Sequence, residues 1–248
     1  MDSEGISPFI RQLKSSSRFR DHVVHHESLP GSRGDYAPTA EPWPKQIRDL
    51  LKKLGIESLY SHQVSAADAV RRGEHTVIAT PTASGKTLVY LLPVLERFLQ
   101  GAGSTALYIS PLKALARDQQ KALNHLLTYL EPENRPAAAV YDGDTPSKER
   151  ARIRKKPPEM LLSNPEMLHL GILPQHGAWS GFLSRLQHVI IDEVHTYRGI
   201  MGSNMAWVFR RLQRICSHYG ANPTFVFCSA TVANPAELAE ELTGLSVR

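Results

Sequence analysis

The segment from Thr80 to Thr87 has residue types and spacing suited to binding a phosphate. It reads TPTASGKT and follows the apolar run 75–80, where we expect a strand. It fits the phosphate-loop pattern G-x-x-x-x-G-K-[ST], except that Thr80 replaces the first glycine. Glycine lets the backbone approach a phosphate closely, and the lysine reaches the β and γ phosphates of a nucleotide. The residues that we expect to bind a nucleotide here are Thr82, Ala83, Ser84, Gly85, Lys86 and Thr87.

A plain strand-to-helix turn is the alternative interpretation of this segment. The helix expected after the segment would then begin at Lys86, whose charge opposes the helix macrodipole at that end. An anion bound at the helix N-terminus removes this conflict. The hydroxyl of Thr87 also supplies an oxygen ligand suited to Mg²⁺. We therefore favour phosphate binding.

Two adjacent acids follow a second apolar run. The run HVIID spans 188–192, so Asp192 ends an expected strand and Glu193 follows it directly. Beside a phosphate loop, the first carboxylate is placed to bind the Mg²⁺ of a nucleotide and the second to activate water for attack on the γ phosphate. Without the loop, the two acids would suit a solvated turn. We predict that Thr87 and Asp192 hold Mg²⁺. The predicted catalytic residues are Lys86, Asp192 and Glu193.

The composition is that of an ordinary globular protein with a slight excess of positive charge. Of 248 residues, 42% are hydrophobic, and 29 Lys and Arg against 24 Asp and Glu give a net charge of +5. This charge allows a polyanionic partner without requiring one. The 2 cysteines are too few for a zinc site, and no apolar run is long enough to span a membrane. We expect a soluble, cytoplasmic protein without a membrane partner.

Short apolar runs alternate with longer segments of helical spacing from residue 43 onward. Runs that are apolar almost throughout are typical of strands buried on both faces of a parallel sheet. The expected strands are 75–80, 105–110, 137–142, 159–163, 188–192 and 224–229. The expected helices are 44–54, 62–72, 87–100, 113–130 and 203–219. This alternation predicts an α/β domain over residues 43–248, with a mostly parallel sheet covered by helices on both faces.

Two other segments have distinctive compositions. Residues 1–42 mix Ser, Pro, Gly, His and Arg without a sustained period, so we expect an irregular arm with a short helix near 9–19. The segment 148–156 holds six basic residues and one acid. The basic run is either a solvated helix face or an extension of a nucleic-acid track, and the sequence leaves both open.

The order of these motifs resembles that of the first RecA-like lobe of superfamily 2 helicases. The box at 192–195 reads DEVH and residues 229–231 read SAT, which is similar to the DEVH-box DNA helicases of the MrfA/YprA type, bacterial relatives of the RecQ-four-like repair helicases. The resemblance covers about residues 44–231. It implies a RecA-like P-loop NTPase domain that uses ATP and Mg²⁺.

The resemblance also implies roles for residues outside the phosphate loop. Gln63, at the end of LGIESLYSHQ, would hydrogen-bond the adenine of ATP. The segments at 110–119, 141–145 and 163–168 resemble motifs that hold the phosphates of one nucleic-acid strand. The nucleic-acid-binding residues implied in this way are Pro111, Lys113, Gly143, Asn164 and Pro165. Those implied to couple the γ phosphate to nucleic-acid binding are His195, Ser229 and Thr231.

The function implied by this resemblance is that of the ATP-binding lobe of an ATP-dependent 3′–5′ DNA helicase or translocase in DNA repair. Its implied partners are single-stranded or partly duplex DNA and a second RecA-like lobe of the same protein, which we expect to lie outside this chain. The implied place of action is the bacterial cytosol, in association with the nucleoid. We expect the lobe alone to bind ATP and to hydrolyse it weakly or not at all.

Three rival functions remain open from the sequence. An RNA helicase lobe would differ in whether RNA or DNA stimulates the intact protein. A nucleotide-dependent interaction module would bind ATP without moving a strand. A P-loop kinase is disfavoured because adjacent Asp192 and Glu193 suit activation of water.

Overall fold

The computed structural model describes residues 6–27, 34–81, 84–101 and 103–248. The chain divides into two units, Met1–Gly34 and Asp35–Arg248, and each is described by itself. In the first unit, α1 spans Ile6–Ser15 and a 3-10 turn spans Arg20–His22. The boundary expected after residue 42 differs from this division. Residues 35–42 fall in the second unit because β1 (Tyr36–Ala37) pairs antiparallel with β2 (Leu59–Tyr60).

The second unit is built on a six-stranded sheet with the order β3-β8-β7-β4-β6-β5, and every neighbouring pair is parallel. The strands are β3 (Thr76–Ala79), β4 (Thr105–Ile109), β5 (Ala138–Val140), β6 (Met160–Ser163), β7 (Leu186–Ile191) and β8 (Thr224–Ser229). Each of the six expected strands is therefore confirmed. Most of their residues are buried, as the long apolar runs predict, and the edge strand β5 is partly exposed.

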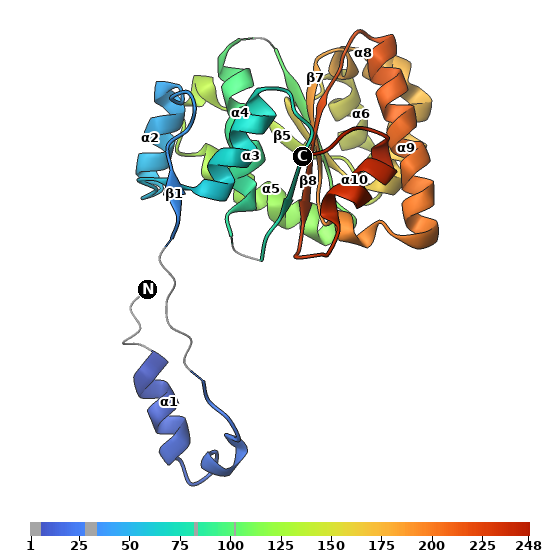
Figure 1. Ribbon diagram of the computed structural model, residues 1–248. Helices are drawn as coiled ribbons and strands as arrows, with labels where there is room; N and C mark the ends of the chain where they lie inside the picture. The colour runs from blue at the N-terminus through green and yellow to red at the C-terminus, as the bar shows by residue number, and fades with distance from the viewer. Residues whose placement is uncertain (1–5, 28–33, 82–83, 102) are drawn as a thin grey trace. The chain divides into compact units, whose positions relative to one another are not determined.

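Helices cover both faces of the sheet, as expected (Figure 1). On one side lie α2 (Lys45–Lys53), α3 (Ser61–Arg71), α4 (Lys86–Leu99) and α5 (Lys113–Leu127). On the other lie α6 (Ser147–Lys155), α8 (Ser180–Leu183), α9 (Gly199–His218) and α10 (Pro235–Thr243). The short helix α7 (Pro165–Met167) continues through helical turns at Leu168–Ile172 and Leu173–Trp179 into α8. The helix α9 begins four residues before the expected 203.

Alternating strand residues supply two separate cores. In β4, Leu107 and Ile109 pack with α9 and α10, whereas Ala106 and Tyr108 pack with α2 to α5. This alternation follows from the two-residue period of a strand. Packing on both faces therefore fixes the position of each strand and of the residues that follow its carboxyl end.

A charged contact holds together the two helices that begin near the phosphate loop. Both Arg71 guanidinium nitrogens Nε and Nη2, on α3, donate to the Glu96 carboxylate on α4 at 2.8 Å. The Arg71 guanidinium also lies over the Trp43 ring, 4.3 Å from its centroid. Bidentate pairs of this kind fix orientation as well as distance. The carboxyl-terminal end of α3 is thereby held beside the last turn of α4.

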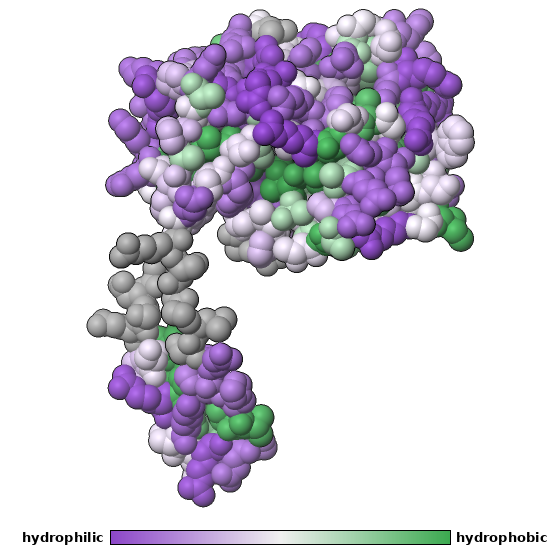
Figure 2. Space-filling view, viewed as in Figure 1, coloured by the Kyte–Doolittle hydropathy of each residue, from purple (hydrophilic) through white to green (hydrophobic). Residues whose placement is uncertain are grey.

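The surface of the second unit is mostly hydrophilic in the view of Figure 2, with hydrophobic residues exposed near its middle. Some apolar exposure is normal for a folded protein. Across the described residues, no helix combines the length and apolar character needed to cross a membrane.

Candidate functional site

Three neighbouring strands bring the predicted catalytic segments to one edge of the sheet. Ala79 of β3 is paired with Ser229 of β8, and Ile191 of β7 is paired with Phe227 of β8. The strand β8 therefore lies between the phosphate loop and the Asp192 carboxylate. Because all three strands are parallel, their carboxyl ends face the same side, which is where ligands bind in open α/β sheets.

In the phosphate loop, the lysine is held by backbone carbonyls. Lys86 Nζ donates to the backbone oxygens of Thr80 at 2.7 Å and Pro81 at 2.9 Å. The hydroxyls of Thr80 and Ser84 are hydrogen-bonded at 2.6 Å. The predicted Thr82 and Ala83 lie outside the described residues. Two neutral carbonyls do not neutralise the Lys86 charge, so the site favours an anion.

Gly85 ends the loop in a backbone conformation that favours glycine. Its φ is +76°, and it immediately precedes α4. A Cβ at this position would lie 2.3 Å from Gln63 Nε2. The close approach shows that Gly85 serves the packing of the loop against α3 as well as its turn.

Gln63 is buried, with its amide directed at this loop. Its Nε2 donates to the backbone oxygen of Gly85 at 3.1 Å, and its Oε1 accepts from the backbone N–H of Tyr60 at 3.0 Å. Gln63 thus links the start of α3 to the phosphate loop. The contact to adenine that the resemblance implies stays a prediction.

Three stacked rings lie beside the loop, and two of them, Tyr36 and His62, were not predicted to lie there. The Tyr36 and Tyr60 rings stack at 5.0 Å, and the Tyr60 and His62 rings stack at 5.6 Å. His62 Nε2 is 3.2 Å from the Ser84 backbone oxygen. The pairing of β1 with β2 brings Tyr36 to Tyr60, so only a long-range prediction of that pairing could have found the stack.

The two acids at the end of β7 have different surroundings. The Tyr108 hydroxyl donates to Asp192 Oδ2, and the backbone N–H of Glu193 donates to Asp192 Oδ1 at 3.0 Å. Glu193 has φ +49°, the one positive value for a non-glycine residue within the described chain. This conformation typically costs about 1–3 kcal/mol and is found most often at functional sites.

His195 lies between the acid and β8. Its Nδ1 is 3.2 Å from Glu193 Oε2 and 3.5 Å from the Ser229 hydroxyl. The structure thereby brings together three predicted residues from two separate motifs. Thr231 is exposed, and within the described residues its side chain makes no hydrogen bond to this group.

A buried, neutral layer lies beneath the carboxylates. Burial raises the pKa of the Tyr108 hydroxyl, and the neighbouring Tyr90 and Asp192 raise it further. Burial, reinforced by Asp192, likewise raises the pKa of the Cys228 thiol and of the Tyr197 hydroxyl. These groups stay uncharged near neutral pH. The weakly polarisable layer strengthens electrostatic interactions at the site.

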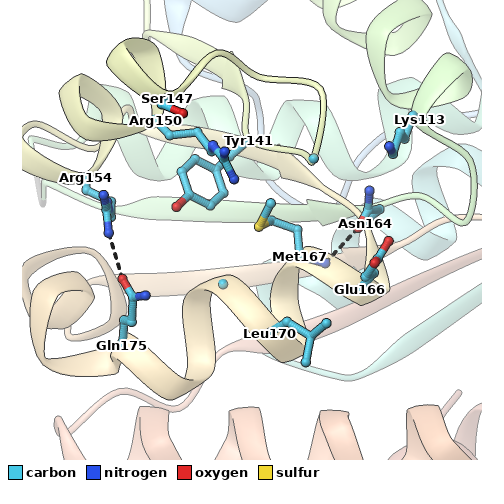
Figure 3. A pocket seen from close by; sticks show the side chains of 12 residues that line it. Lys113, Tyr141, Ser147, Arg150, Arg154, Asn164, Glu166, Met167, Leu170 and Gln175 are labelled. Carbon is cyan, nitrogen blue, oxygen red and sulfur yellow. Dashed lines mark hydrogen bonds between the residues drawn. The ribbon is translucent and has the colours of Figure 1, made fainter.

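A second group of predicted residues surrounds a pocket of about 490 Å³ at the ends of β4, β5 and β6 (Figure 3). Lys113, Gly143 and Asn164 all line it. Lys113 Nζ is 2.8 Å from Asp144 Oδ1. Asn164 Oδ1 accepts the Met167 N–H at 2.8 Å, which leaves the Asn164 amide nitrogen for a ligand.

The two predicted prolines lie at the rim of the same sheet edge. Pro111 follows β4 and Pro165 is the first residue of α7, and both are partly exposed. The order β4-β6-β5 makes their strands neighbours. The predicted nucleic-acid-binding residues therefore form one cluster. Their contacts within the chain do not test whether they bind nucleic acid.

Comparisons with known proteins match this arrangement to one family. A family model for DEAD/DEAH box helicases matches residues 60–238. The ATP-dependent helicase YprA of Bacillus subtilis (strain 168) is 42% identical over 248 residues, which are 100% of this chain and 32% of YprA. The ATP-dependent helicase HRQ1 of Saccharomyces cerevisiae is 35% identical over 97% of this chain and 22% of HRQ1.

A solved structure matches in fold as well as in sequence. The crystal structure of the helicase MrfA bound to DNA and AMPPNP has a TM-score of 0.84 and 45% identity, covering 88% of this chain and 30% of the MrfA chain. This chain thus spans about a third or less of the length of the three proteins.

Proposed function

This chain belongs to the DEAD/DEAH box helicase family, and from that premise we propose that it is the ATP-binding lobe of an ATP-dependent DNA helicase. We infer that the whole protein translocates 3′ to 5′ along DNA and acts in DNA repair. The names of YprA and HRQ1 as ATP-dependent helicases support the motor activity, and the MrfA complex with DNA supports the substrate. Because this chain spans 32% of the length of YprA, a second RecA-like lobe of the same protein is the proposed partner.

One observation carries the proposal. Lys86 and Glu193 follow β3 and β7, the strands on either side of β8, at the same edge of the sheet, and His195 joins Glu193 to Ser229 of β8. This geometry suits a nucleotide whose phosphates meet Lys86 while water is held near Glu193. A change at the γ phosphate would then reach β8 through His195.

The oxygen donors at this edge fit Mg²⁺. The Thr87 hydroxyl lies in the first turn of α4 and the Asp192 carboxylate follows β7, and both residues are half-buried. Mg²⁺ prefers oxygen ligands and takes most of them from phosphate and water. Bound there, Mg²⁺ would offset negative charge on the β and γ phosphates. Thr87 and Asp192 are the residues that would hold it.

The roles of this chain's own side chains follow from their positions. Lys86 would leave its loop carbonyls and donate to phosphate oxygens. Glu193 would accept a proton from the attacking water, held in place by His195. The buried Gln63 amide would keep the loop beside α3 and contribute to adenine binding.

DNA would cross the ends of β4, β5 and β6. Lys113 and the Asn164 amide nitrogen would meet phosphates, and the exposed Gly143 would let the strand approach the backbone. Pro111 and Pro165 would border the same path. A motor that needs ATP and chromosomal DNA would act in the bacterial cytosol at the nucleoid.

The first experiment is titration of a fluorescent ATP analogue with and without Mg²⁺ and single-stranded DNA. Lys86→Ala should weaken binding about 10- to 100-fold, because charge-assisted hydrogen bonds contribute about 1.5–3 kcal/mol. Glu193→Gln should bind ATP normally and abolish any hydrolysis. The control is Lys121→Ala, which removes an exposed lysine whose one ion-pair partner in the described part of the chain is Asp118.

Equal affinity of the Lys86→Ala and Lys121→Ala proteins for the nucleotide would contradict the assignment of the phosphate loop. Comparison of single-stranded DNA with RNA of the same sequence tests the substrate. Stronger stimulation by RNA would contradict the DNA assignment.

A further inference from the structure

The pocket at the ends of β4, β5 and β6 continues beyond the residues assigned to the strand path. Figure 3 shows Lys113 and Asn164 on one side of the hollow, with Arg150 and Arg154 of α6 on the other. We call the part lined by Arg150, Arg154, Gln175, Met167 and Leu170 the α6 pocket. Of these five residues, only Met167 belongs to a segment that resembles a motif, 163–168.

The six basic residues of 148–156 differ in what they face. Arg150 and Arg154, one helical turn apart, are partly buried and line the pocket, whereas Lys148, Arg152, Lys155 and Lys156 are exposed. The basic run therefore divides into two groups, and only Arg150 and Arg154 are placed where they could extend a nucleic-acid track. One face of α6 is solvated, and the other borders a cavity.

The two arginines that line the pocket lack acidic partners among the described residues. Arg152 pairs with Glu149 on the solvated face, but Arg154 Nη1 donates to the neutral Gln175 Oε1 at 2.7 Å. No carboxylate lies within ion-pair distance of Arg150. Like charges at positions i and i+4 destabilise a helix. An anion in the pocket would relieve this repulsion.

The remaining surface of the α6 pocket is apolar. Met167 is half-buried, and Leu170 is 61% exposed although it lines the hollow. Gly171 also lines the pocket, and because a Cβ there would lie 2.3 Å from Met167 Sδ, the glycine lets the Met167 thioether pack against the backbone. A flat, apolar group can therefore rest on this surface beside the guanidinium groups. A phosphate group alone would not need an apolar surface.

We propose that the α6 pocket binds one further nucleotide of single-stranded DNA, with its phosphodiester on Arg150 and Arg154 and its base against Met167 and Leu170. The inference rests on the proposed function and extends the strand path past Lys113 and Asn164. The base must be unstacked from its neighbours to enter, as is usual when proteins bind single strands. Gln175 holds Arg154 in position and offers its amide nitrogen to the base.

The phosphate contact is tested by the salt dependence of DNA affinity. Affinity of the full chain for a fluorescently labelled thymidine 20-mer is measured over a range of salt concentrations. For single strands, each lost phosphate contact should reduce the slope of log affinity against log salt by about 0.7, or about fivefold in affinity near 0.1 M salt. Arg150→Gln and Arg154→Gln should each show this loss.

The matched control is Lys155→Gln, which removes one positive charge from the exposed face of the same helix. It should leave the slope nearly unchanged. Equal slopes for Arg150→Gln, Arg154→Gln and Lys155→Gln would overturn the phosphate contact. Circular dichroism of each variant verifies the fold.

The base contact is tested with 2-aminopurine placed at successive positions of the strand. Its fluorescence should rise at one position on binding, because a base in the pocket is no longer stacked on its neighbours. Leu170→Ser should remove that rise. Trp207→Ser, at an exposed apolar residue of α9 outside the pocket, should not. A signal that is uniform along the strand would overturn the base contact.

ATP binding separates failure of this inference from failure of the proposed function. All five variants should bind the ATP analogue like the unchanged protein, since none of the five substituted residues lies in the nucleotide site. If the unchanged chain binds ATP but no single-stranded DNA, the α6 pocket is overturned and the nucleotide site remains. If it binds DNA through Arg150 and Arg154 but no ATP, the proposed motor lobe fails instead.

Discussion

Gln63 Nε2 lies 3.1 Å from the backbone oxygen of Gly85, so a residue near the start of α3 is bonded to the last residue of the phosphate loop. A Cβ on Gly85 would lie 2.3 Å from that nitrogen. If the loop moves on nucleotide binding, the start of α3 must therefore shift with it or lose this hydrogen bond. Gly85 is therefore needed for close packing against Gln63 as well as for its positive φ.

Gly85→Ala should weaken nucleotide binding and lower the free energy of unfolding more than a glycine replacement in open space. Gly55 has nearly the same φ, +71°, but nothing within 4 Å of a Cβ, so Gly55→Ala isolates the cost of the backbone conformation. That cost is about 1–2 kcal/mol. Urea unfolding and ATP-analogue titration provide the comparison.

The added loss in Gly85→Ala is attributed to displacement of the Gln63 amide. The double variant Gln63→Ala, Gly85→Ala should therefore be less destabilised than the sum of the two single variants. Strict additivity would show that Gln63 does not clash with the new methyl group.

Local patterns in the sequence predicted the strands well. Residues 188–191 and 224–229 are mostly apolar because both faces are buried, and Asp192 and Glu193 interrupt that pattern where the sheet ends. The phosphate loop was similarly recognisable from Gly85 and Lys86. These features depend on residues that are close in the chain.

Contacts that depend on distant segments were not predictable in the same way. Tyr36 meets Tyr60 only through the pairing of β1 with β2, and Tyr108 meets Asp192 only because β4 lies beside β7. Which basic residues of 148–156 line the pocket depends on the orientation of α6, and the sequence does not reveal that orientation. In the sequence, Arg150 and Arg154 cannot be distinguished from the other basic residues of 148–156. Only the structure shows that these two line the pocket.

Tyr108→Phe should lower the free energy of unfolding by about 1.5–3 kcal/mol, the usual contribution of a hydrogen bond to a charged group. The Tyr108 hydroxyl is buried and donates to Asp192, so its removal leaves Asp192 Oδ2 without that donor. Tyr129→Phe is the control, because Tyr129 is partly exposed and its hydroxyl makes no hydrogen bond among the described residues. Urea unfolding measures both, and equal effects would contradict the importance of the Tyr108 donor.

His195→Gln should weaken the thermodynamic coupling between ATP binding and DNA binding. His195 contacts both Glu193 and Ser229, so its loss should leave affinity for ATP alone nearly unchanged. The factor by which DNA changes ATP affinity should fall toward one, and by linkage the effect of ATP on DNA affinity should fall equally. The measurement is ATP titration with and without DNA.

The control for this coupling is His169→Gln, an exposed histidine far from β8 in the sheet order. It should keep the coupling factor of the unchanged protein. A His195→Gln protein with the same coupling factor would show that the signal from the γ phosphate does not pass through His195.

Stability should fall in mild acid because of His188 in β7. Burial, reinforced by the positive charge of Arg97, lowers the pKa of His188 from 6.5 to about 4. In the unfolded chain His188 takes up a proton as the pH falls through 6.5, whereas the folded chain resists protonation until about 4. The contribution to stability is therefore fully present above pH 6.5 and is lost progressively between these two values, by about 3 kcal/mol in total.

His188→Gln should remove this part of the acid sensitivity. The unchanged protein should lose about 2 kcal/mol of unfolding free energy between about pH 7.5 and pH 5 through His188, and the variant should lose that much less. The control His125→Gln, at an exposed histidine, should keep the acid sensitivity of the unchanged protein. Urea unfolding at each pH makes the comparison, and parallel acid profiles for all three proteins would show that His188 is protonated equally in the folded and unfolded chains.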